Sequence, residues 1–461
     1  MRSPSYPSPN HAVQGAPQIT LGAYNPTSAA SNTHLVTLNG IHVTVVSKTN
    51  PAAVLGTFDL ENCIASPNAR VPSHVAWDYR GNTWVFSVLG QASAGHHVLC
   101  IYVGITANVF GAYNGYSYNM SSGTLNSTDY MRMAIWREAY AFTFDGLGND
   151  LCVWDFTNAT FFCGASFNSG PLQWAPMTAA EGEMPDRNVA SAASPTAGAV
   201  FFRAIDDEYE SNATTPTVDF IEVEHWYGIN FNASTYNAWR YLIPVADFIK
   251  SPLLGVPTPD VQTLNAQSAV LMNRINFIKQ RNATVLTLTS NSSVVFWFEL
   301  VWAKPSPSAA ELWMLAQQGN ISVAASGNSA FLPTASMDTN GTIVLAMAIS
   351  GESTYPSLYM TSRLANDPLG QMRNLTMLAS GQIGSTFSTG GSNWGSYWSV
   401  TTDPSGPRTF FVTGQVSLIA SDGWSGRVFR VRVLGETIRR IWRAQDTCGQ
   451  EVTCDQFIVA S

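Results

Sequence analysis

The sequence predicts an all-β protein built as a single β-propeller of seven blades, and three observations point to this fold class. A short unit recurs in which an aspartate precedes two turn residues, a glycine and an apolar strand. Asp78, Asp145, Asp338 and Asp403 each stand three residues before such a glycine. Helical periodicity is nearly absent, and repeats of this kind mark stacked or radial β architectures. Radial closure of seven mostly four-stranded units would remove exposed sheet edges.

The unit is clearest in residues 333–350, which read PTASMDTNGTIVLAMAIS. Asn340 and Gly341 form the turn of a predicted hairpin, because both central positions of such a turn need positive φ. Asp338 caps that turn by accepting bonds from backbone N–H groups that follow it. By analogy, the innermost strands of the seven blades are predicted near His34, Trp77, Ile135, Ala192, Arg274, Met337 and Val400.

The chain is expected to divide into an extended N-terminal arm (residues 1–30), the propeller (31–434) and a C-terminal tail (435–461). The arm is rich in serine and proline and has too few apolar side chains to form a packed core. Residues 436–445 show helical spacing. A helix there would place Ile438, Ile441 and Trp442 on one face, as an apolar stripe flanked by three arginines.

Composition favours a secreted or cell-surface glycoprotein. Charged residues make up 12% of the 461 residues, about half of the roughly 25% of an ordinary soluble domain. A net charge of −8 argues against a nucleic-acid partner. No apolar run reaches the roughly 18 residues of a membrane span. Glycans on ten Asn-x-Ser/Thr sequons would keep the surface in water: Asn119, Asn126, Asn158, Asn212, Asn232, Asn282, Asn291, Asn320, Asn340 and Asn374.

The beginning of the chain conflicts with this localisation. Residues 1–17 lack the apolar segment of a signal peptide. The expectation is therefore that processing has removed the signal.

The even number of cysteines favours three disulfides in an extracellular chain. Cys152 and Cys163 flank a turn and suit a hairpin disulfide, and Cys448 and Cys454 suit a short C-terminal loop. Cys63 and Cys100 are then left for each other, although the pairing itself stays open. The spacing matches no zinc-finger pattern.

Several segments carry a resemblance to a known family, in order along residues 29–433. The most specific read ASMDTNGTIVLAMAISGESTYPSLYMTSRLANDPLG and NWGSYWSVTTDPSGPRTFFVTGQV, after VAWDYRGNTWVFSV and TDYMRMAIWREAYAFTF. They resemble a family of secreted β-propeller proteins that is distantly akin to the Asp-box, sialidase-like propellers. The family has an acidic residue after Trp-Gly, where this chain has Ser396. The resemblance implies a propeller and carries no established activity.

The densest carboxylate cluster is Asp206, Asp207 and Glu208, with Glu210 close behind. Carboxylate oxygens are the ligands that Ca²⁺ prefers. The cluster is therefore the candidate metal site, and the alternative is a solvated acidic loop at a blade edge.

Other residues suggest carbohydrate chemistry, each beside a structural alternative. Glu222 and Glu224 share one strand face, as a glycosidase acid and nucleophile could, or they form an exposed polar face. Sialidases hold their substrate carboxylate with clustered arginines. The candidates Arg137, Arg203, Arg274 and Arg363 fall in different predicted blades, and no sialidase-like Arg-Ile-Pro segment accompanies them.

The repeated aspartates and the aromatic residues admit two readings as well. The aspartates before Gly turns are interpreted as structural caps rather than catalytic groups. Trp394, Tyr397 and Trp398 would either stack on sugars or pack between blades.

Together these features predict a non-catalytic extracellular glycoprotein, a structural or adhesive propeller module without a bound cofactor. Its expected partner is a second copy or another extracellular protein in a larger assembly or filament, and glycans are a further candidate ligand. The alternative is a carbohydrate-active enzyme or a lectin-like binder at the propeller axis. An enzyme would show convergent carboxylates or a metal in an axial pocket, whereas a structural module would show a filled or featureless channel.

Overall fold

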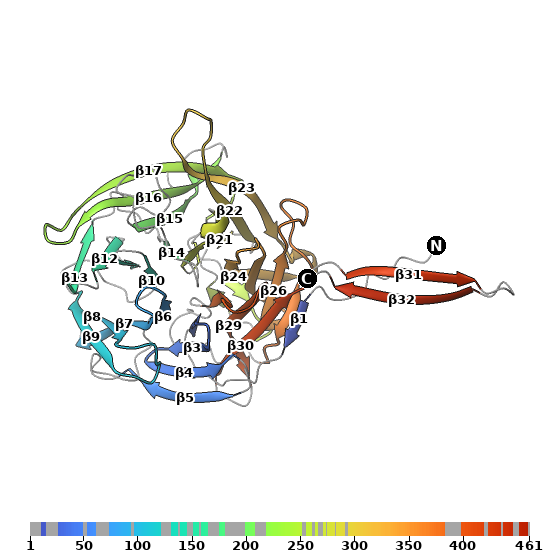
Figure 1. Ribbon diagram of the computed structural model, residues 1–461, viewed down its shortest axis with the longest axis horizontal. Coiled ribbons are helices and arrows are strands. Elements are labelled where there is room, and N and C mark those ends of the chain that lie inside the picture. Colours follow the sequence, from blue (N-terminus) through green and yellow to red (C-terminus); the bar gives the residue numbers. More distant parts are fainter. Residues whose placement is uncertain are drawn as a thin grey trace.

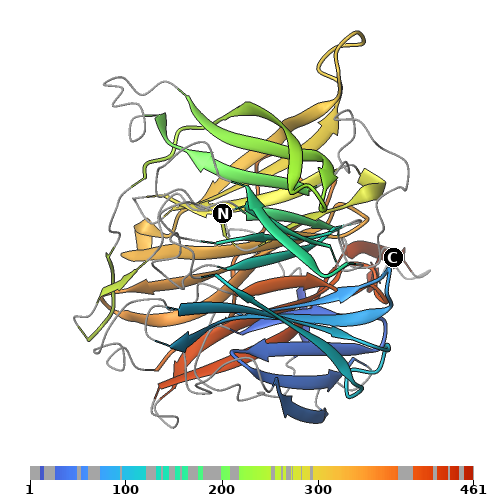
Figure 2. The same ribbon diagram turned by 90° about the vertical axis from the view of Figure 1, so that its left-hand side faces the viewer.

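The computed structural model shows a seven-bladed β-propeller (Figure 1). It describes residues 11–14, 26–48, 53–60, 73–93, 96–120, 131–136, 139–144, 151–155, 158–164, 175–179, 199–207, 218–250, 255–260, 263–265, 271–272, 274–281, 283–290, 294–382, 398–418, 423–434, 437–445 and 451–459. Two short 3₁₀ turns, Lys279–Arg281 and Ala324–Ser326, lie among the strands. Figure 2 shows the same strands from the side of the ring.

The first four blades follow the chain in order and are antiparallel throughout. Blade 1 contains β2 (Thr27–Ala30), β3 (His34–Asn39), β4 (His42–Ser47) and β5 (Val54–Asp59). Blade 2 contains β6 (Ser73–Asp78), β7 (Thr83–Ser93), β8 (His96–Gly104) and β9 (Tyr113–Asn119). Blade 3 contains β10 (Arg132–Ile135), β11 (Tyr140–Thr143), β12 (Leu151–Asp155) and β13 (Thr160–Gly164). Blade 4 contains β14 (Ala175–Ala179), β15 (Ala199–Ile205), β16 (Asp219–Asn230) and β17 (Thr235–Val245).

The last three blades complete the ring. Blade 5 contains β20 (Ile275–Phe277), β21 (Ala283–Thr289), β22 (Val295–Ala303) and β23 (Leu312–Ile321). Blade 6 contains β24 (Asn328–Met337), β25 (Ile343–Gly351), β26 (Thr354–Arg363) and β27 (Thr376–Ala379). Blade 7 contains β28 (Ser399–Thr402), β29 (Thr409–Leu418) and β30 (Gly423–Val433), and β1 (His11–Gln14) is its outermost strand.

Two features depart from a plain ring of four-stranded sheets. β20 pairs in parallel with β14 of blade 4, and the bridge between Ile278 and Ala283 connects it to β21. Between blades 4 and 5 the chain forms a small hairpin of β18 (Gly255–Pro257) and β19 (Thr263–Asn265).

The innermost strands contact one another in a closed cycle, from β2 through β6, β10, β14, β20, β24 and β28 back to β2. The predictions near Trp77, Ile135, Met337 and Val400 are confirmed, because these residues lie in β6, β10, β24 and β28. Arg274 directly precedes β20.

The prediction near His34 is wrong, since that residue opens the second strand of its blade. Blade 1 begins instead at Thr27, inside the predicted arm. Thr27–Ala30 reads TSAA, which lacks apolar alternation, and the ring nevertheless buries all four residues. Ala192 lies outside the described residues.

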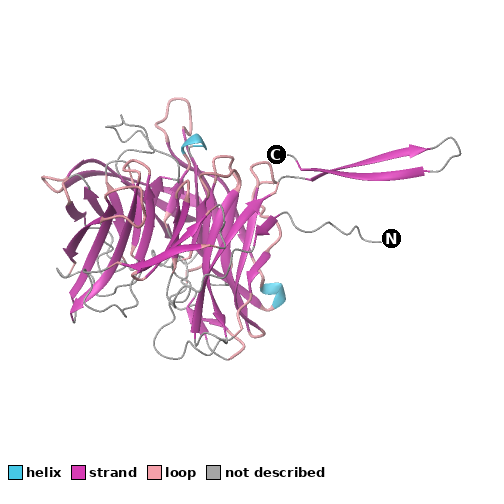
Figure 3. Ribbon diagram, turned by 60° about the horizontal axis from the view of Figure 1, so that its bottom comes forward, coloured by secondary structure: helices cyan, strands magenta, loops and turns pink. Residues whose placement is uncertain are grey.

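The predicted C-terminal helix is also wrong. Residues 437–445 form β31 (Thr437–Gln445), which pairs antiparallel with β32 (Glu451–Val459). This hairpin stands away from the propeller (Figure 3). Ile438 and Ile441 are three residues apart, so in a strand their positions fall on opposite faces and the predicted apolar stripe does not form. The helical spacing covered only ten residues, and pairing with a second strand satisfies the backbone groups instead.

Apolar side chains pack between neighbouring sheets. In the described part of the chain, each of the seven interfaces between blades holds its own core cluster. Large aromatic side chains fill them, and Trp84, Trp154 and Trp297 have no exposed surface. The smallest cluster joins blade 7 to blade 1. Its members are Ala30, Leu35, Val46, Phe411 and Val428.

The cysteines add a covalent tie. Cys152 and Cys163 stand opposite each other on β12 and β13 and are joined by a disulfide. Cys100 of β8 is disulfide-bonded as well, and its partner lies outside the described residues. Cys63 and Cys448 lie outside them too, while Cys454 is in β32.

The repeated aspartates close turns and also contact the next blade. Asp338 accepts bonds from the N–H groups of Asn340 (3.0 Å) and Thr342 (2.8 Å) in its own turn, and from Arg408 N–H (2.9 Å) of blade 7. Asp78 accepts a bond from Tyr140 Oη of blade 3 at 2.8 Å. Asp145 lies outside the described residues. The three described aspartates are therefore structural, since each joins two blades.

Blade 7 meets blade 1 through polar contacts. Ser28 N–H donates to Ser399 Oγ at 3.0 Å, and Thr413 Oγ1 lies 2.8 Å from Ser28 Oγ. Lys48 Nζ lies 2.5 Å from Asp403 Oδ1, and both side chains are almost fully buried. Together with the pairing of β1 on β30, these contacts close the ring.

Replacing Lys48 with methionine should destabilise the protein by about 3 kcal/mol, because the buried Asp403 would lose its close cation and keep Arg430 at 3.8 Å. Urea unfolding measures this loss. Lys304→Met is the matched control, since Lys304 is exposed, and it should change stability by no more than about 0.5 kcal/mol. Equal stability of the two variants would show that the buried pair does not hold the ring together.

Candidate functional site: an aromatic groove on the propeller rim

The middle of the ring is crossed by Arg274, which extends from blade 5 toward the opposite blades. Its guanidinium donates to Val75 O of β6 at 3.0 Å and to Ser28 O of β2 at 3.4 Å. His74 is buried beside it, and burial together with the charge of Arg274 lowers the pKa of His74 to about 3. Arg274 therefore connects blade 5 to blades 1 and 2 across the middle of the ring.

The arginines considered for substrate binding do not converge. Arg203 pairs with Glu222 inside blade 4. Arg363 lies 3.8 Å from Glu299 of blade 5 and donates to Asp367 O at 2.8 Å. Arg137 lies outside the described residues. The described arginines thus stabilise separate parts of the propeller, and no sialidase-like cluster forms among them.

Glu222 and Glu224 are buried, so neither the exposed polar face nor an open catalytic pair is correct. Arg203 pairs with Glu222, and Arg240 lies 2.6 Å from Glu224. Trp226 Nε1–H also donates to Glu224 at 2.6 Å. Burial raises the pKa of Glu224. The sequence pattern could not reveal this burial, because the arginines come from the strands on either side of β16.

The carboxylate cluster has a member that the sequence did not reveal. Asp206, Asp207 and Asp219 offer carboxylate oxygens that lie within 4.8 Å of one another. Glu208 and Glu210 lie outside the described residues. Asp219 begins β16, and only the pairing of β15 with β16 brings it to the other two.

Backbone N–H groups occupy much of this cluster. Asp219 accepts bonds from Phe248 N–H at 2.6 Å and Asp207 N–H at 3.1 Å, and Asp206 accepts one from Lys250 N–H at 2.5 Å. Burial raises the pKa of Asp219 to about 6. Three of the six carboxylate oxygens therefore already accept backbone N–H groups. The contacts give the cluster a structural role, tying the segment after β17 to the ends of β15 and β16.

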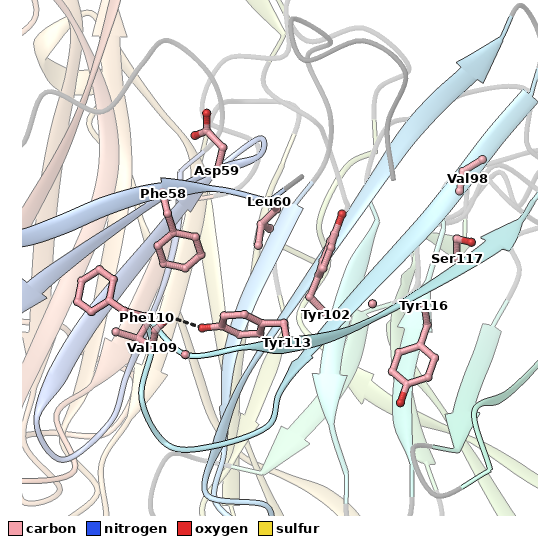
Figure 4. A pocket seen from close by; sticks show the side chains of 12 residues that line it. Phe58, Asp59, Leu60, Val98, Tyr102, Val109, Phe110, Tyr113, Tyr116 and Ser117 are labelled. Carbon is pink, nitrogen blue, oxygen red and sulfur yellow. Dashed lines mark hydrogen bonds between the residues drawn. The ribbon is translucent and has the colours of Figure 1, made fainter. Parts of the chain in front are cut away.

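A groove of about 710 Å³ lies on the rim between blades 1 and 2 (Figure 4). The end of β5 forms one wall with Phe58, Asp59 and Leu60, and β8 and β9 form the other with Tyr102 and Ser117. The loop between β8 and β9 closes one end of the groove with Val109, Phe110 and Gly111. Its volume is in the range of ligand sites, roughly 300–1,000 Å³.

Aromatic rings gather at one end of this groove. Phe58 packs edge-on against Phe110, with ring centroids 6.0 Å apart, and stacks on Tyr113 at 6.1 Å. Figure 4 shows these three rings side by side. Phe110 also rests on Gly56, where a Cβ would come within 2.9 Å of the ring. Phe110 nevertheless keeps 47% of its surface exposed.

The groove has one charged edge. Among the described residues that line it, Asp59 is the only one with a charged side chain. Its carboxylate lies 2.5 Å from His42 Nδ1, and both side chains are more than half exposed. Ser117 adds a hydroxyl on the opposite wall. Because Asp59 and Phe58 are successive residues of β5, the Asp59 carboxylate points away from the face that carries the Phe58 ring (Figure 4), and the groove combines flat apolar surface with the Ser117 hydroxyl.

Sequence reasoning missed this groove, because its walls come from separate blades and no short motif connects them. The one available signal is the alternation of tyrosines in residues 113–119, YNGYSYN. Of the aromatic residues proposed for sugar stacking, Trp394 and Tyr397 lie outside the described residues. Trp398 is buried in the core between blades 6 and 7, which supports the packing alternative for that residue.

The known structures that resemble this chain share little sequence with it. The sequence matches no family model and no curated protein. The β-propeller domain of Cps50 (Swd1) from Myceliophteria thermophila has a TM-score of 0.45 at 8% identity, over 92% of this chain and 99% of that one. The extracellular domains 1–2 of Drosophila semaphorin 1b give 0.43 at 6%, over 92% and 86%. A hypothetical selenium-binding protein from Sulfolobus tokodaii gives 0.44 at 10%, over 76% of each chain. No described helix is long and apolar enough to cross a membrane.

The pH dependence of stability tests the structural role of the Asp219 cluster. Because the pKa of Asp219 rises from 3.8 to about 6 on folding, the folded state holds a proton that the unfolded state releases. The contribution of Asp219 to stability therefore falls as pH rises from about 4 to 6. The Asp219→Asn variant lacks this pH dependence. The difference in free energy of unfolding between the wild type and the variant should therefore be larger at pH 4 than at pH 7.

Urea unfolding across this pH range measures the difference. Asp367→Asn is the control of opposite sign, because Arg373 lowers the pKa of Asp367 against the effect of burial. That variant should lose more stability at pH 7 than at pH 3, because a lowered pKa contributes stability that is present above the unfolded value of 3.8 and is lost as the pH falls below it. Calcium that stabilised the wild type at pH 7, but not Asp219→Asn, would contradict a purely structural cluster and support a metal site.

Proposed function

We propose that this chain is an extracellular glycoprotein whose propeller is a non-catalytic contact module, structural or adhesive, and that the groove between blades 1 and 2 is its contact site. The observation that carries the proposal is the position of that groove. It lies on the rim among aromatic side chains, whereas Arg274 crosses the middle of the ring. Ligand contacts would therefore form on the outer surface of the propeller.

The arrangement of the charged groups supports a module without catalysis. An acid–base pair needs two titratable groups that share a cavity and whose pKa values are shifted apart. Three buried carboxylates are instead paired with cations, Glu222 with Arg203, Glu224 with Arg240 and Asp403 with Lys48, and buried Asp206 and Asp219 accept backbone N–H groups. Among the described residues that line the groove, no carboxylate points toward the rings, which suits binding better than proton transfer.

Exposure of the sequons supports a glycosylated surface. The structure describes six of the ten, and each of these asparagines is exposed: Asn119, Asn158, Asn232, Asn320, Asn340 and Asn374. The other four sequons lie outside the described residues. Glycans at these exposed sites would hydrate a surface that has few charged side chains.

The C-terminal hairpin supports assembly with a second copy. An isolated two-stranded hairpin is at best marginally stable in water. Neither strand pairs with a third strand of the described chain, so each offers a backbone edge. Its first strand carries Arg439, Arg440 and Arg443 in a chain of net charge −8. Pairing of this hairpin with an acidic neighbouring copy would satisfy both the edges and the charge, and a head-to-tail contact of this kind builds rings or filaments.

Purification from the native source tests this proposal. Peptide mapping after enzymatic deglycosylation should show that Asn158 and Asn232 carried glycans, since both are exposed in turns. Asn340 should be modified less, because its side-chain amide donates to Asp338 at 3.3 Å inside a tight turn. Light scattering of the same preparation should show particles larger than one chain. Unmodified asparagines at every sequon, or a strictly monomeric protein, would contradict the proposal.

A further inference from the structure

We infer that the groove between blades 1 and 2 binds neutral oligosaccharides by stacking their pyranose rings on Phe110. The inference rests on the proposed contact function and names its ligand. Pyranose rings combine flat C–H faces with outward hydroxyl groups. A site for them needs an exposed aromatic ring and a hydrogen-bond acceptor nearby. Both lie in this groove (Figure 4).

The aromatic platform is held in place before any ligand arrives. Phe110 N–H donates to Asn108 Oδ1 at 3.1 Å, and Gly111 N–H donates to Asn108 O at 2.9 Å. Tyr113 Oη donates to Val109 O and so ties the loop to β9. Phe58 supports the Phe110 ring from the side, and Gly56 leaves the space beneath it. Stacking on such a ring costs little conformational entropy, because the loop is already ordered.

A second ring, that of Tyr102, lines the groove and keeps 9% of its surface exposed. Gly115 stands opposite Tyr102 in the pairing of β8 with β9, and a Cβ at Gly115 would touch the Tyr102 ring at 3.7 Å. A larger residue at position 115 would therefore cover this ring. With glycine there, apolar surface continues from the Phe110 end of the groove toward Ser117. An elongated ligand can follow that surface.

The polar groups select a neutral ligand that carries hydroxyls. Among the described residues that line the groove, no charged side chain points into it, because Asp59 lies on the other face of blade 1, where it contacts His42 at 2.5 Å. A charged ligand would therefore find no counter-charge, whereas the Ser117 hydroxyl can both donate and accept hydrogen bonds. A small cation would instead need rings that face a common centre. Here the rings of Phe58, Phe110 and Tyr113 pack against one another. The volume of about 710 Å³ also exceeds what a single methylated ammonium group would fill.

Isothermal titration of the purified chain with cellohexaose and mannohexaose tests this inference. An oligogalacturonate of similar length is the anionic probe, and a peptide of residues 1–10 is the proline-rich probe. Because Asn119 lies two residues beyond Ser117, all proteins carry Asn119→Gln, so that no glycan at this sequon reaches the groove. At least one neutral oligosaccharide should bind, and the two other probes should not.

Two substitutions in the groove should weaken this binding. Phe110→Ala should raise the Kd about tenfold, as the loss of one stacked ring implies, and Ser117→Ala, which removes the hydroxyl in the groove, should raise it several-fold. Leu369→Ala, at a 75% exposed position on blade 6, is the matched control and should leave the Kd unchanged. Equal thermal midpoints of all variants would show that each still folds.

Other outcomes overturn the inference in distinguishable ways. Binding of the anionic or proline-rich probe, lost in Phe110→Ala, would keep the groove as a contact site but contradict its ligand class. Neutral sugar that binds equally well to Phe110→Ala would place the site elsewhere. Failure of every probe would contradict the ligand class and leave glycan mapping and assembly size as separate tests of the proposed function.

Discussion

Closure of the ring between blade 7 and blade 1 is the constraint on which the structure depends. The other six interfaces hold larger apolar clusters, whereas this one has the smallest described core. Hydrogen bonds around Ser28, the buried pair of Lys48 with Asp403 and the strand β1 on β30 complete it. A buried ion pair is strongly unfavourable when one partner is lost. The first and last blades must therefore meet with both charges in place.

Aspartates at turns connect neighbouring blades elsewhere in the ring as well. Asp78 and Asp338 contact the next blade from turns between the first and second strands of their own blades, and Asp403 does so at the closure. A side chain that caps its own turn reaches its neighbour with little further loss of conformational freedom. Arg274 then braces the middle of the ring. With the centre used for structure, open concave surface lies on the rim between blades 1 and 2.

The sequence predicted the fold class because turn chemistry is local. An Asp-x-x-Gly unit before an apolar strand can be recognised without knowing its partners, and it located β6, β24 and β28. The small residues of Thr27–Ala30 and the four-residue β1 could not be recognised, since the pairing of distant strands places them in the sheets. The helix expected at residues 437–445 failed because the backbone pairs with β32 instead.

The candidate site was less predictable than the fold. Phe58 and Phe110 belong to different blades, and only the packing of those blades brings their rings together. Asp219 likewise joins Asp206 through strand pairing. For Glu222 and Glu224 the sequence pattern was misleading. A strand pattern cannot distinguish an exposed carboxylate from one that is paired with an arginine on the next strand. Local patterns thus predicted architecture, while the chemistry depended on contacts between blades.

The central claim is that the axis of this propeller is structural and that its ligands bind on the rim. Hydrogen–deuterium exchange of the intact protein, with and without a saturating neutral oligosaccharide, tests it most directly. The account predicts slower exchange in residues 54–60 and 98–117, and no change in residues 27–30 and 274–281. Slower exchange confined to the strands around the axis would contradict it.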